Sequence, residues 1–286
     1  MTHVRFRLRF VPLLLILLIL PPCLAIPAGT TPSPDPLLNK PKPTTILVRV
    51  VGHGSMVLGK DMGGARITIT DATSGTILAS GLQQGDAGDQ NQIMRTPRMM
   101  GEPVYSSLGS ASFTTTLELT HPILVEIAAE GPLAYPESTQ RASTTVWLVP
   151  GQGTINDGIV LHLYGYIVQI EHPKSGEPLI AKDDVTLRAS VRTLSGALVR
   201  PYGDWDSRKI QIYGEVLTGT RVLERLQLFY NNDTAGFEAP FFVPLPNDTP
   251  DGITLRVVAA DPSSGNVGVG SAKYPVVSER LKPPTR

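Results

Sequence analysis

Apolar and polar residues alternate with a period of two along most of the chain. In ARITITD, Ala65, Ile67 and Ile69 alternate with polar side chains, and residues 185–193 and 253–261 repeat this pattern. Such alternation is typical of strands that have one face on a core and the other in water. Ser-Gly pairs beside many of these segments supply the positive φ that tight turns need. The pattern predicts an all-β fold built from antiparallel sheets.

One longer segment predicts a particular pairing of strands. In SFTTTLELTHPILVEIAAEG, residues 112–131, two alternating runs flank His121-Pro122. We interpret this as a hairpin that turns at His121-Pro122. In such a hairpin Ser112 and Glu130 lie side by side at the end opposite the turn.

Proline-rich and apolar stretches divide the chain. The prolines between residues 26 and 43 predict an extended linker, because proline lacks a backbone donor and favours polyproline geometry. Beyond the linker there is enough apolar chain for two β-sandwich domains in tandem, which we place at residues 44–163 and 164–278. A polar tail, residues 279–286, follows. We expect the two domains to fold separately and to join near residues 166–172.

The first 25 residues have the pattern of a secretory signal peptide. Arginines precede an apolar run, residues 10–20, which ends at Pro21-Pro22, and Ala25 closes a cleavage site. The run is shorter than the ~20 residues of a spanning helix. We therefore expect an exported protein, periplasmic or extracellular, with no transmembrane segment in the remaining chain. Cys23, the only cysteine, falls within the removed segment; its lipidation is the alternative.

Composition restricts the classes of partner. The chain has 25 basic and 25 acidic residues and 41% hydrophobic residues, and it contains no run of Lys or Arg. Removal of residues 1–25 takes away three arginines and no acidic residue, which leaves a slightly acidic protein. Binding to nucleic acid or to an anionic membrane needs a basic patch, and none is visible.

Two segments resemble known families. GARITITDATSGTILASG, residues 64–81, resembles the strand-turn-strand of transthyretin-like or carboxypeptidase-regulatory-like sandwiches, although a long loop follows where that family has a short turn. Residues 246–276 resemble the last hairpin of bacterial immunoglobulin-like domains, with Asp251-Gly252 before one strand and a turn at residues 261–266. Ile253 stands where many members carry a tyrosine. Both resemblances imply scaffolding or binding modules and no catalysis.

Candidate catalytic chemistry is sparse. His53 stands near Ser55 in GHGSMVLG, but the spacing does not form a Gly-x-Ser-x-Gly elbow. The other histidines beyond the signal segment, His121, His162 and His172, show no metal-ligand spacing, and we interpret them as structural or surface residues. We expect no enzyme activity and no cofactor.

Acidic turns offer weak calcium candidates. Oxygen ligands gather near strand ends at Asp183, Asp184, Asp204 and Asp206, and again in Asn231-Asn232-Asp233. No stretch has the spacing of an EF-hand, and carboxylates also cap ordinary turns. We therefore predict no metal site.

Two tryptophans have an open interpretation. Trp147 is out of phase with Val146 and Leu148, which favours a half-buried strand position over a carbohydrate platform. Trp205 stands in a loop, where an exposed aromatic side chain is a better candidate for ligand binding.

The segment GLQQGDAGDQNQIMRTPRMMGEPVYSSLGSASF, residues 81–113, interrupts the strand pattern with a long loop, and such loops are functional or disordered. A second irregular segment follows Glu130. If the predicted hairpin forms, both loops emerge at one edge. Together they carry methionine, arginine and tyrosine side chains of the kind enriched at protein interfaces. These candidate partner-binding residues are Met94, Arg95, Arg98, Met99, Met100, Tyr105, Tyr135 and Arg141.

The function that these patterns favour is a non-enzymatic exported module that binds or spaces something at a bacterial cell envelope. The predicted contact surface is the protein-binding edge formed by the two loops. The alternative is an accessory module that binds carbohydrate or calcium in support of an envelope enzyme. The partner is then an envelope protein or a glycan.

Overall fold

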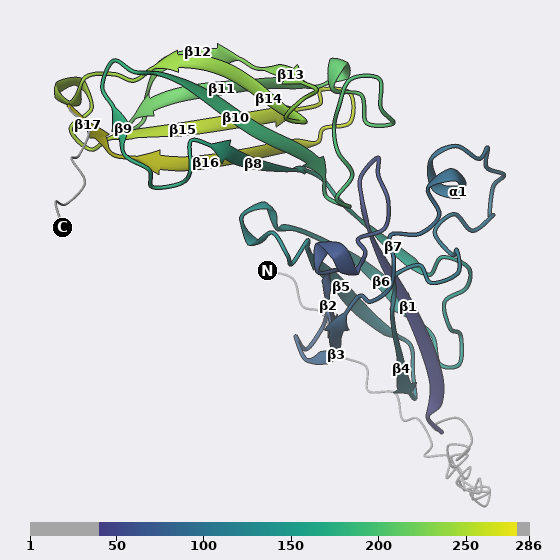
Figure 1. The fold of residues 1–286 in the computed structure, drawn as a ribbon. Helices are drawn as coiled ribbons and strands as arrows, with labels where there is room; N and C mark the ends of the chain where they lie inside the picture. Colours follow the sequence, from purple (N-terminus) through teal and green to yellow (C-terminus); the bar gives the residue numbers. More distant parts are fainter. Residues whose placement is uncertain (1–39, 279–286) are drawn as a thin grey trace, which may run out of the picture. The chain divides into compact units, whose positions relative to one another are not determined.

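The computed structural model describes residues 40–278. These residues form two β-sandwiches in tandem, as the sequence predicts (Figure 1). The predicted signal peptide with Cys23, most of the predicted linker and the polar tail lie outside the described residues. Within the described residues no helix is long and apolar enough to cross a membrane.

The first sandwich, purple to teal in Figure 1, has two sheets with the strand orders β4-β1-β7 and β3-β2-β5-β6. Its strands are β1 (Lys42–Gly52), β2 (Arg66–Asp71), β3 (Ile77–Leu82), β4 (Phe113–Leu119), β5 (Ile123–Gly131), β6 (Gln140–Leu148) and β7 (Ile159–Leu163). β1 begins inside the stretch assigned to the linker, and its Pro43 pairs with Glu118 of β4. The ladder between β1 and β7 is parallel, unlike the other pairs of this sandwich.

Inward-facing aliphatic side chains from both sheets make the first core. The predicted face of β2 is confirmed, since Ala65, Ile67 and Ile69 are fully buried. They pack with the inward residues of β1 and β5. Burial of aliphatic surface is the main favourable term in such a core.

The predicted hairpin at His121-Pro122 is wrong. β4 pairs with β1, whereas β5 pairs with β2 and β6. The chain therefore crosses from one sheet to the other at residues 120–122 instead of turning within a sheet. Glu130 pairs with Arg66 and Arg141, and Ser112 forms a bridge with Gln84. Ser112 and Glu130 are not neighbours in a ladder.

The second sandwich, green to yellow in Figure 1, has the sheets β13-β14-β10-β8 and β12-β11-β15-β16, with the small parallel pair β9 and β17. Its strands are β8 (Tyr166–His172), β9 (Leu179–Ile180), β10 (Asp184–Thr193), β11 (Gln211–Thr218), β12 (Arg221–Gln227), β13 (Phe229–Asn231), β14 (Gly236–Phe242), β15 (Ile253–Ala260), β16 (Val267–Tyr274) and β17 (Val276–Val277). The last hairpin, predicted around residues 261–266, is confirmed by the β15–β16 pairing.

The second core is continuous from β8 to β16, and the predicted inward face of β15 is buried throughout. Two glycines of β16 allow that strand to approach β8. A Cβ on Gly268 would lie 2.5 Å from the Tyr166 carbonyl oxygen, and one on Gly270 would lie 2.5 Å from that of Val168. Larger residues at these two positions would force the sheets apart.

The two sandwiches meet at a short connection. Only Tyr164 and Gly165 separate β7 from β8, so the long apolar stretch from Gly158 to Pro173 divides into two strands. Ile167 and Leu194, which belong to strands or turns of the second sandwich, are buried in the first core. Apolar contacts therefore continue across the connection.

Candidate functional site

The long loop between β3 and β4 is folded. Gln84 forms a bridge with Ser112, and Asp86 forms one with Ser110, so the two ends of the loop run together. Between them lies a short helix, α1 (Gln90–Met94), which the sequence reading did not predict. The Asp89 side chain caps it by accepting a hydrogen bond from Gln92 N at 2.9 Å.

A small apolar cluster holds this loop on the sandwich. Ile93 of α1 and Ala111 are buried against Val51, Met56 and Val57. Val51 is on the outer face of β1, opposite the main core. This sheet is therefore covered on both faces, and the loop supplies the outer cover.

Asp157 fixes the middle of the loop. Its carboxylate accepts hydrogen bonds from Val104 N at 2.6 Å, from Tyr105 N at 2.9 Å and from Ser106 Oγ at 2.6 Å. Hydrogen bonds to an ionised acceptor are stronger than neutral ones. Sequence reasoning missed this residue, because Asn156-Asp157-Gly158 resembles any polar turn.

Arg49 lies beneath this anchor. It is buried, and its Nη1 donates to the Asp157 carbonyl oxygen at 3.0 Å. Burial lowers the pKa of the Arg49 guanidinium, and the negative charge of Asp157 opposes that shift. Its Nε has no hydrogen-bond partner among the described residues. Arg49 therefore supports the anchor through the Asp157 backbone, and its charge is attracted to the Asp157 carboxylate.

The anchored loop presents apolar side chains to solvent. Asn156 Nδ2 donates to Gly101 O at 3.3 Å, and Ser106 Oγ donates to Asn156 O at 3.1 Å, which joins the loop to the turn before β7. The large apolar residues on these joined segments, here called the apolar rim, are Met99 (72% exposed), Met100 (104%), Leu108 (104%) and Ile155 (79%). Met99, Met100 and Leu108 belong to the loop and Ile155 to the turn that is hydrogen-bonded to it, and large exposed apolar side chains are candidates for an interaction site.

The predicted partner-binding residues divide into four groups, three of them on the long loop. Met99 and Met100 are on the apolar rim, whereas Met94 and Tyr105 are half-buried against the loop's apolar cluster. The loop arginines are engaged within the chain: Arg95 Nη2 is 2.8 Å from Asp204 Oδ2, and Arg98 donates to the Ile93 carbonyl.

Tyr135 and Arg141 lie on other elements. Tyr135 packs on the first core next to the short 3-10 helix η2 (Pro136–Ser138), and Arg141 of β6 is 3.8 Å from Glu130. No hydrogen bond among residues 40–278 joins segment 95–109 to segment 131–141.

Leu108 and Ile155 were not identified from the sequence, since isolated apolar residues in irregular segments give no periodic signal.

Four aromatic side chains meet where β1 and β7 end: His53 just after β1, His162 on the edge strand β7, Tyr164 just after it, and Tyr105 of the loop. The rings of His53 and Tyr164 stack with centroids 4.0 Å apart, and His162 lies edge-on to His53 at 5.8 Å. Tyr105 of the loop is 6.4 Å from His162. The sequence treated these residues as separate, because the β1 to β7 pairing that brings them together is not visible in it.

The two tryptophans differ in their exposure to solvent. Trp147 of β6 faces outward and is 66% exposed, more than the half-buried position that was expected. Trp205 is half-buried between the second core and the loop's apolar cluster, and its Nε1 donates to Gly54 O at 3.0 Å. Trp205 therefore belongs to the contact between the sandwiches.

Two of the four acidic candidates, Asp204 and Asp206, are paired with arginines of the chain. Asp206 forms an ion pair with Arg208, which holds the pKa of that carboxyl well below its usual range. Asp204 pairs with Arg95. Asp184 is the first residue of β10 and Asp183 precedes it. Among residues 40–278, no three His, Cys, Asp or Glu side chains converge on a possible metal position.

His53 and Ser55 do not form a nucleophile and base. The hydroxyl of Ser55 hydrogen-bonds to the hydroxyl of Ser195, and the His53 ring stacks on Tyr164. Nucleophilic catalysis requires the base within hydrogen-bond reach of the hydroxyl. Both residues instead contribute to the connection between the sandwiches.

Comparisons with known proteins give no family. No family model and no curated protein matches the chain. Solved structures with some likeness include the fibronectin(III)-like modules of Clostridium thermocellum CbhA, at 10% identity over 77% of this chain and 83% of that chain, with a TM-score of 0.25. A chimeric titin Z1Z2 has 13% identity over 84% of this chain and 99% of that chain, with a TM-score of 0.26. The mouse nectin-like molecule 4 ectodomain has 12% identity over 85% of this chain and 67% of that chain, with a TM-score of 0.23. Such scores carry no argument, so the fold rests on the strand order above.

Proposed function

We propose that this protein is a non-enzymatic exported module of a bacterial cell envelope that binds a protein partner through the apolar rim. The observation that carries the proposal is the combination of exposure and order at the rim. Met99, Met100, Leu108 and Ile155 are exposed, yet the segments that bear them are held by Asp157 and by the apolar cluster under α1.

Order at the rim favours binding because a preformed surface loses little conformational entropy on association. A disordered apolar loop would lose much more. Methionine side chains also adapt to partners of different shape, since they are unbranched and polarisable. The partner that fits is a protein with an apolar patch or groove.

The proposed edge is narrower than the one inferred from the sequence. It keeps Met99 and Met100, adds Leu108 and Ile155, and leaves Tyr135 and Arg141 outside, since they pack or pair on other elements. We also propose that the first domain begins at Lys42, where β1 starts, and that the second follows residue 163.

The proposal is tested by capture from a bacterial envelope extract. A chain that carries Met99→Ser, Met100→Ser and Leu108→Ser together should retain a captured partner at least about tenfold less well than the unmodified chain, since a few buried side chains supply most of the binding energy of an interface. The matched control changes Phe229→Ser and Phe242→Ser, which are each 70% exposed on the second sandwich. The proposal is contradicted if the rim variant captures as much partner as the unmodified chain, or if the control variant loses as much captured partner as the rim variant.

A further inference from the structure

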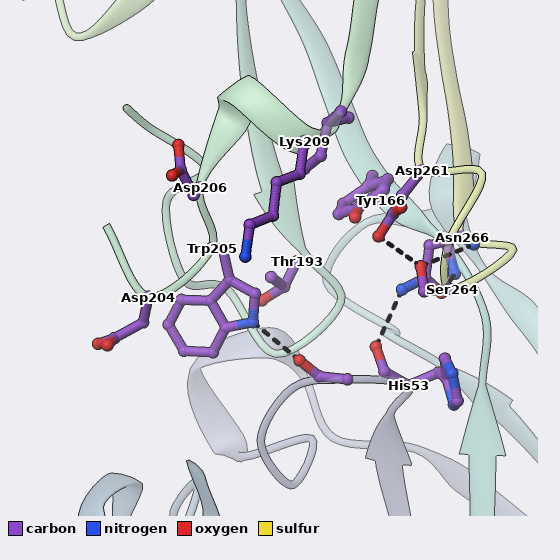
Figure 2. Close-up of a pocket in the computed structure, with 13 residues that line it drawn as sticks. His53, Tyr166, Thr193, Asp204, Trp205, Asp206, Lys209, Asp261, Ser264 and Asn266 are labelled. Carbon is purple, nitrogen blue, oxygen red and sulfur yellow. Dashed lines mark hydrogen bonds between the residues drawn. The ribbon is translucent and has the colours of Figure 1, made fainter. Parts of the chain in front are cut away.

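A polar cavity lies at the connection between the two sandwiches (Figure 2). Its volume is about 160 Å³, and residues of both sandwiches line it. Figure 2 shows His53 and the neighbouring backbone below the cavity, Trp205 and Lys209 on one side, and Tyr166, Asp261 and Asn266 on the other.

Hydrogen bonds between the sandwiches shape the walls. Asn266 Oδ1 accepts from Gly165 N at 3.0 Å, and its Nδ2 donates to His53 O at 3.0 Å. On the other side Trp205 Nε1 donates to Gly54 O at 3.0 Å. The cavity is therefore preformed, and its walls do not need to be ordered by a ligand.

Two of the three carboxylates at the cavity are already neutralised. Asp204 accepts from Arg95 at 2.8 Å and from Gln90 at 2.5 Å. Asp206 is paired with Arg208, the middle residue of the 3-10 helix η3 (Ser207–Lys209). These two residues line the cavity without giving it a net negative charge.

The remaining lining groups include one cation and one anion that have no ion-pair partner among residues 40–278. Lys209 has no ion pair among residues 40–278. Asp261 accepts from the hydroxyls of Ser263 at 2.6 Å and Ser264 at 2.7 Å, and it too has no ion pair in this part of the chain. The cavity thus offers donors and acceptors with almost no net charge.

Tyr166 adds a donor that stays protonated. Only 5% of this residue is exposed, and its side chain lines the cavity beside Asp261. Burial, followed by the charge of Asp261, raises the pKa of the Tyr166 hydroxyl to about 12. At neutral pH the group is a phenol O–H and never a phenolate.

From these features we propose that the cavity binds one ring of an uncharged saccharide. A sugar hydroxyl both donates and accepts, which matches Lys209 and Tyr166 as donors and Asp261 as an acceptor. Trp205 supplies an aromatic wall for the C–H groups of the ring. The volume corresponds to about five waters at ~30 Å³ each, which is the scale of a single small ring.

Charged ligands fit less well. With Asp204 and Asp206 ion-paired, the lining keeps one unpaired cation, Lys209, and one unpaired anion, Asp261, so a ligand with a net charge of either sign meets a like charge on the lining. A neutral polyol meets neither repulsion. The site is separate from the apolar rim, so a glycan and a protein partner could be bound at the same time.

The test uses the full chain with Trp147→Phe, so that Trp205 is the only tryptophan and reports on the cavity. Glucose, galactose and N-acetylglucosamine are the neutral probes, and glucosamine and galacturonic acid are the charged comparators. We expect saturable fluorescence changes with at least one neutral sugar, at an affinity about tenfold higher than for its charged analogue.

Two substitutions locate the binding. Lys209→Met and Tyr166→Phe should each weaken sugar binding by about tenfold, because each removes one donor and leaves the cavity wall in place. Lys174→Met, an exposed lysine outside the cavity, is the control and should change nothing. Circular dichroism confirms that each variant is folded.

Three results would overturn the proposal: no binding of any neutral sugar at millimolar concentration, equal binding by the Lys209→Met and Tyr166→Phe variants, or a preference for a charged analogue. The capture experiment with the apolar rim does not depend on any of these outcomes.

Discussion

At the residue scale, Asp157 holds the middle of the long loop in place. One carboxylate holds two backbone N–H groups and a hydroxyl of the long loop, and Arg49 lies under it. The order of the apolar rim therefore depends on a residue that is not itself part of the rim. Two substitutions at Asp157 test how strongly it holds the loop.

Asp157→Ala should lower the free energy of unfolding by about 2 kcal/mol, since it leaves these donors without an acceptor and Arg49 without its counter-charge. Cleavage within residues 95–109 should also become faster in limited proteolysis. Asp157→Asn keeps one acceptor oxygen and should lose less. An Asp157→Ala chain as stable and as resistant as the unmodified one would show that the loop is held by its apolar cluster alone.

His162 provides a prediction about pH. Burial, followed by the nearby His53, lowers the pKa of the His162 imidazole in the folded chain. The unfolded chain therefore takes up this proton first, near the usual pKa of about 6.5. At pH 8 His162 is neutral in both the folded and the unfolded chain, so it costs no stability. The free energy of unfolding falls as the pH drops from 7 to 5.

Urea denaturation at pH 8 and pH 5 measures this loss of stability. Other groups titrate in the same range, so the informative quantity is the difference between the unmodified chain and His162→Gln. The variant should lose less stability between the two pH values. If both chains lose the same free energy of unfolding between pH 8 and pH 5, His162 does not contribute to the pH dependence of stability.

At the element scale, periodicity predicted which faces of the strands are buried but did not predict their partners. The inward residues of β2 and β15 follow the alternation directly, whereas β10 departs from it at Ser190, which is buried although it was predicted on the polar face. The same alternation in β4 and β5 is compatible with a hairpin or with a crossing between sheets, because either arrangement buries the same residues. Helix α1 was missed because five residues are too short for a helical period.

The close approach of β16 to β8 gives an element-scale prediction. Gly270→Ala should cost about 1–3 kcal/mol, because the added Cβ would meet the Val168 carbonyl and the strands would have to separate. Ser271→Ala, on the exposed face of the same strand, should be nearly neutral. Chemical denaturation compares the two. If the glycine variant is as stable as the serine variant, the two strands are not in tight contact.

At the scale of the whole molecule, the all-β tandem architecture could be predicted from alternation, turns and length. The contact between the sandwiches could not. It is made by residues far apart in sequence, such as Asn266 with His53 and Arg95 with Asp204, and no local pattern encodes such pairs. The apolar rim could be predicted only in part from the sequence. The composition of the loop suggested binding, but the extent of the rim depended on which side chains pack inward.

Leu187→Asp tests whether the two sandwiches unfold separately. Leu187 is fully buried in the second core, so a charge there should destabilise that sandwich by at least about 4 kcal/mol. Hydrogen exchange should show β15 opening at lower denaturant concentration than β2. Simultaneous opening of both strands would mean that Ile167 and Leu194, which reach into the first core, couple the sandwiches into one unit.

The central claim, that the apolar rim is a protein-binding surface, is tested most directly by methionine oxidation in the presence of the captured partner. Met99 and Met100 are exposed, whereas Met56 and Met62 are buried and serve as internal controls. In the free chain peroxide should oxidise the first pair quickly and the second pair slowly. The account predicts that the partner slows oxidation of Met99 and Met100 by about tenfold and leaves Met56 and Met62 unchanged. Undiminished oxidation of Met99 and Met100 in the complex would contradict it.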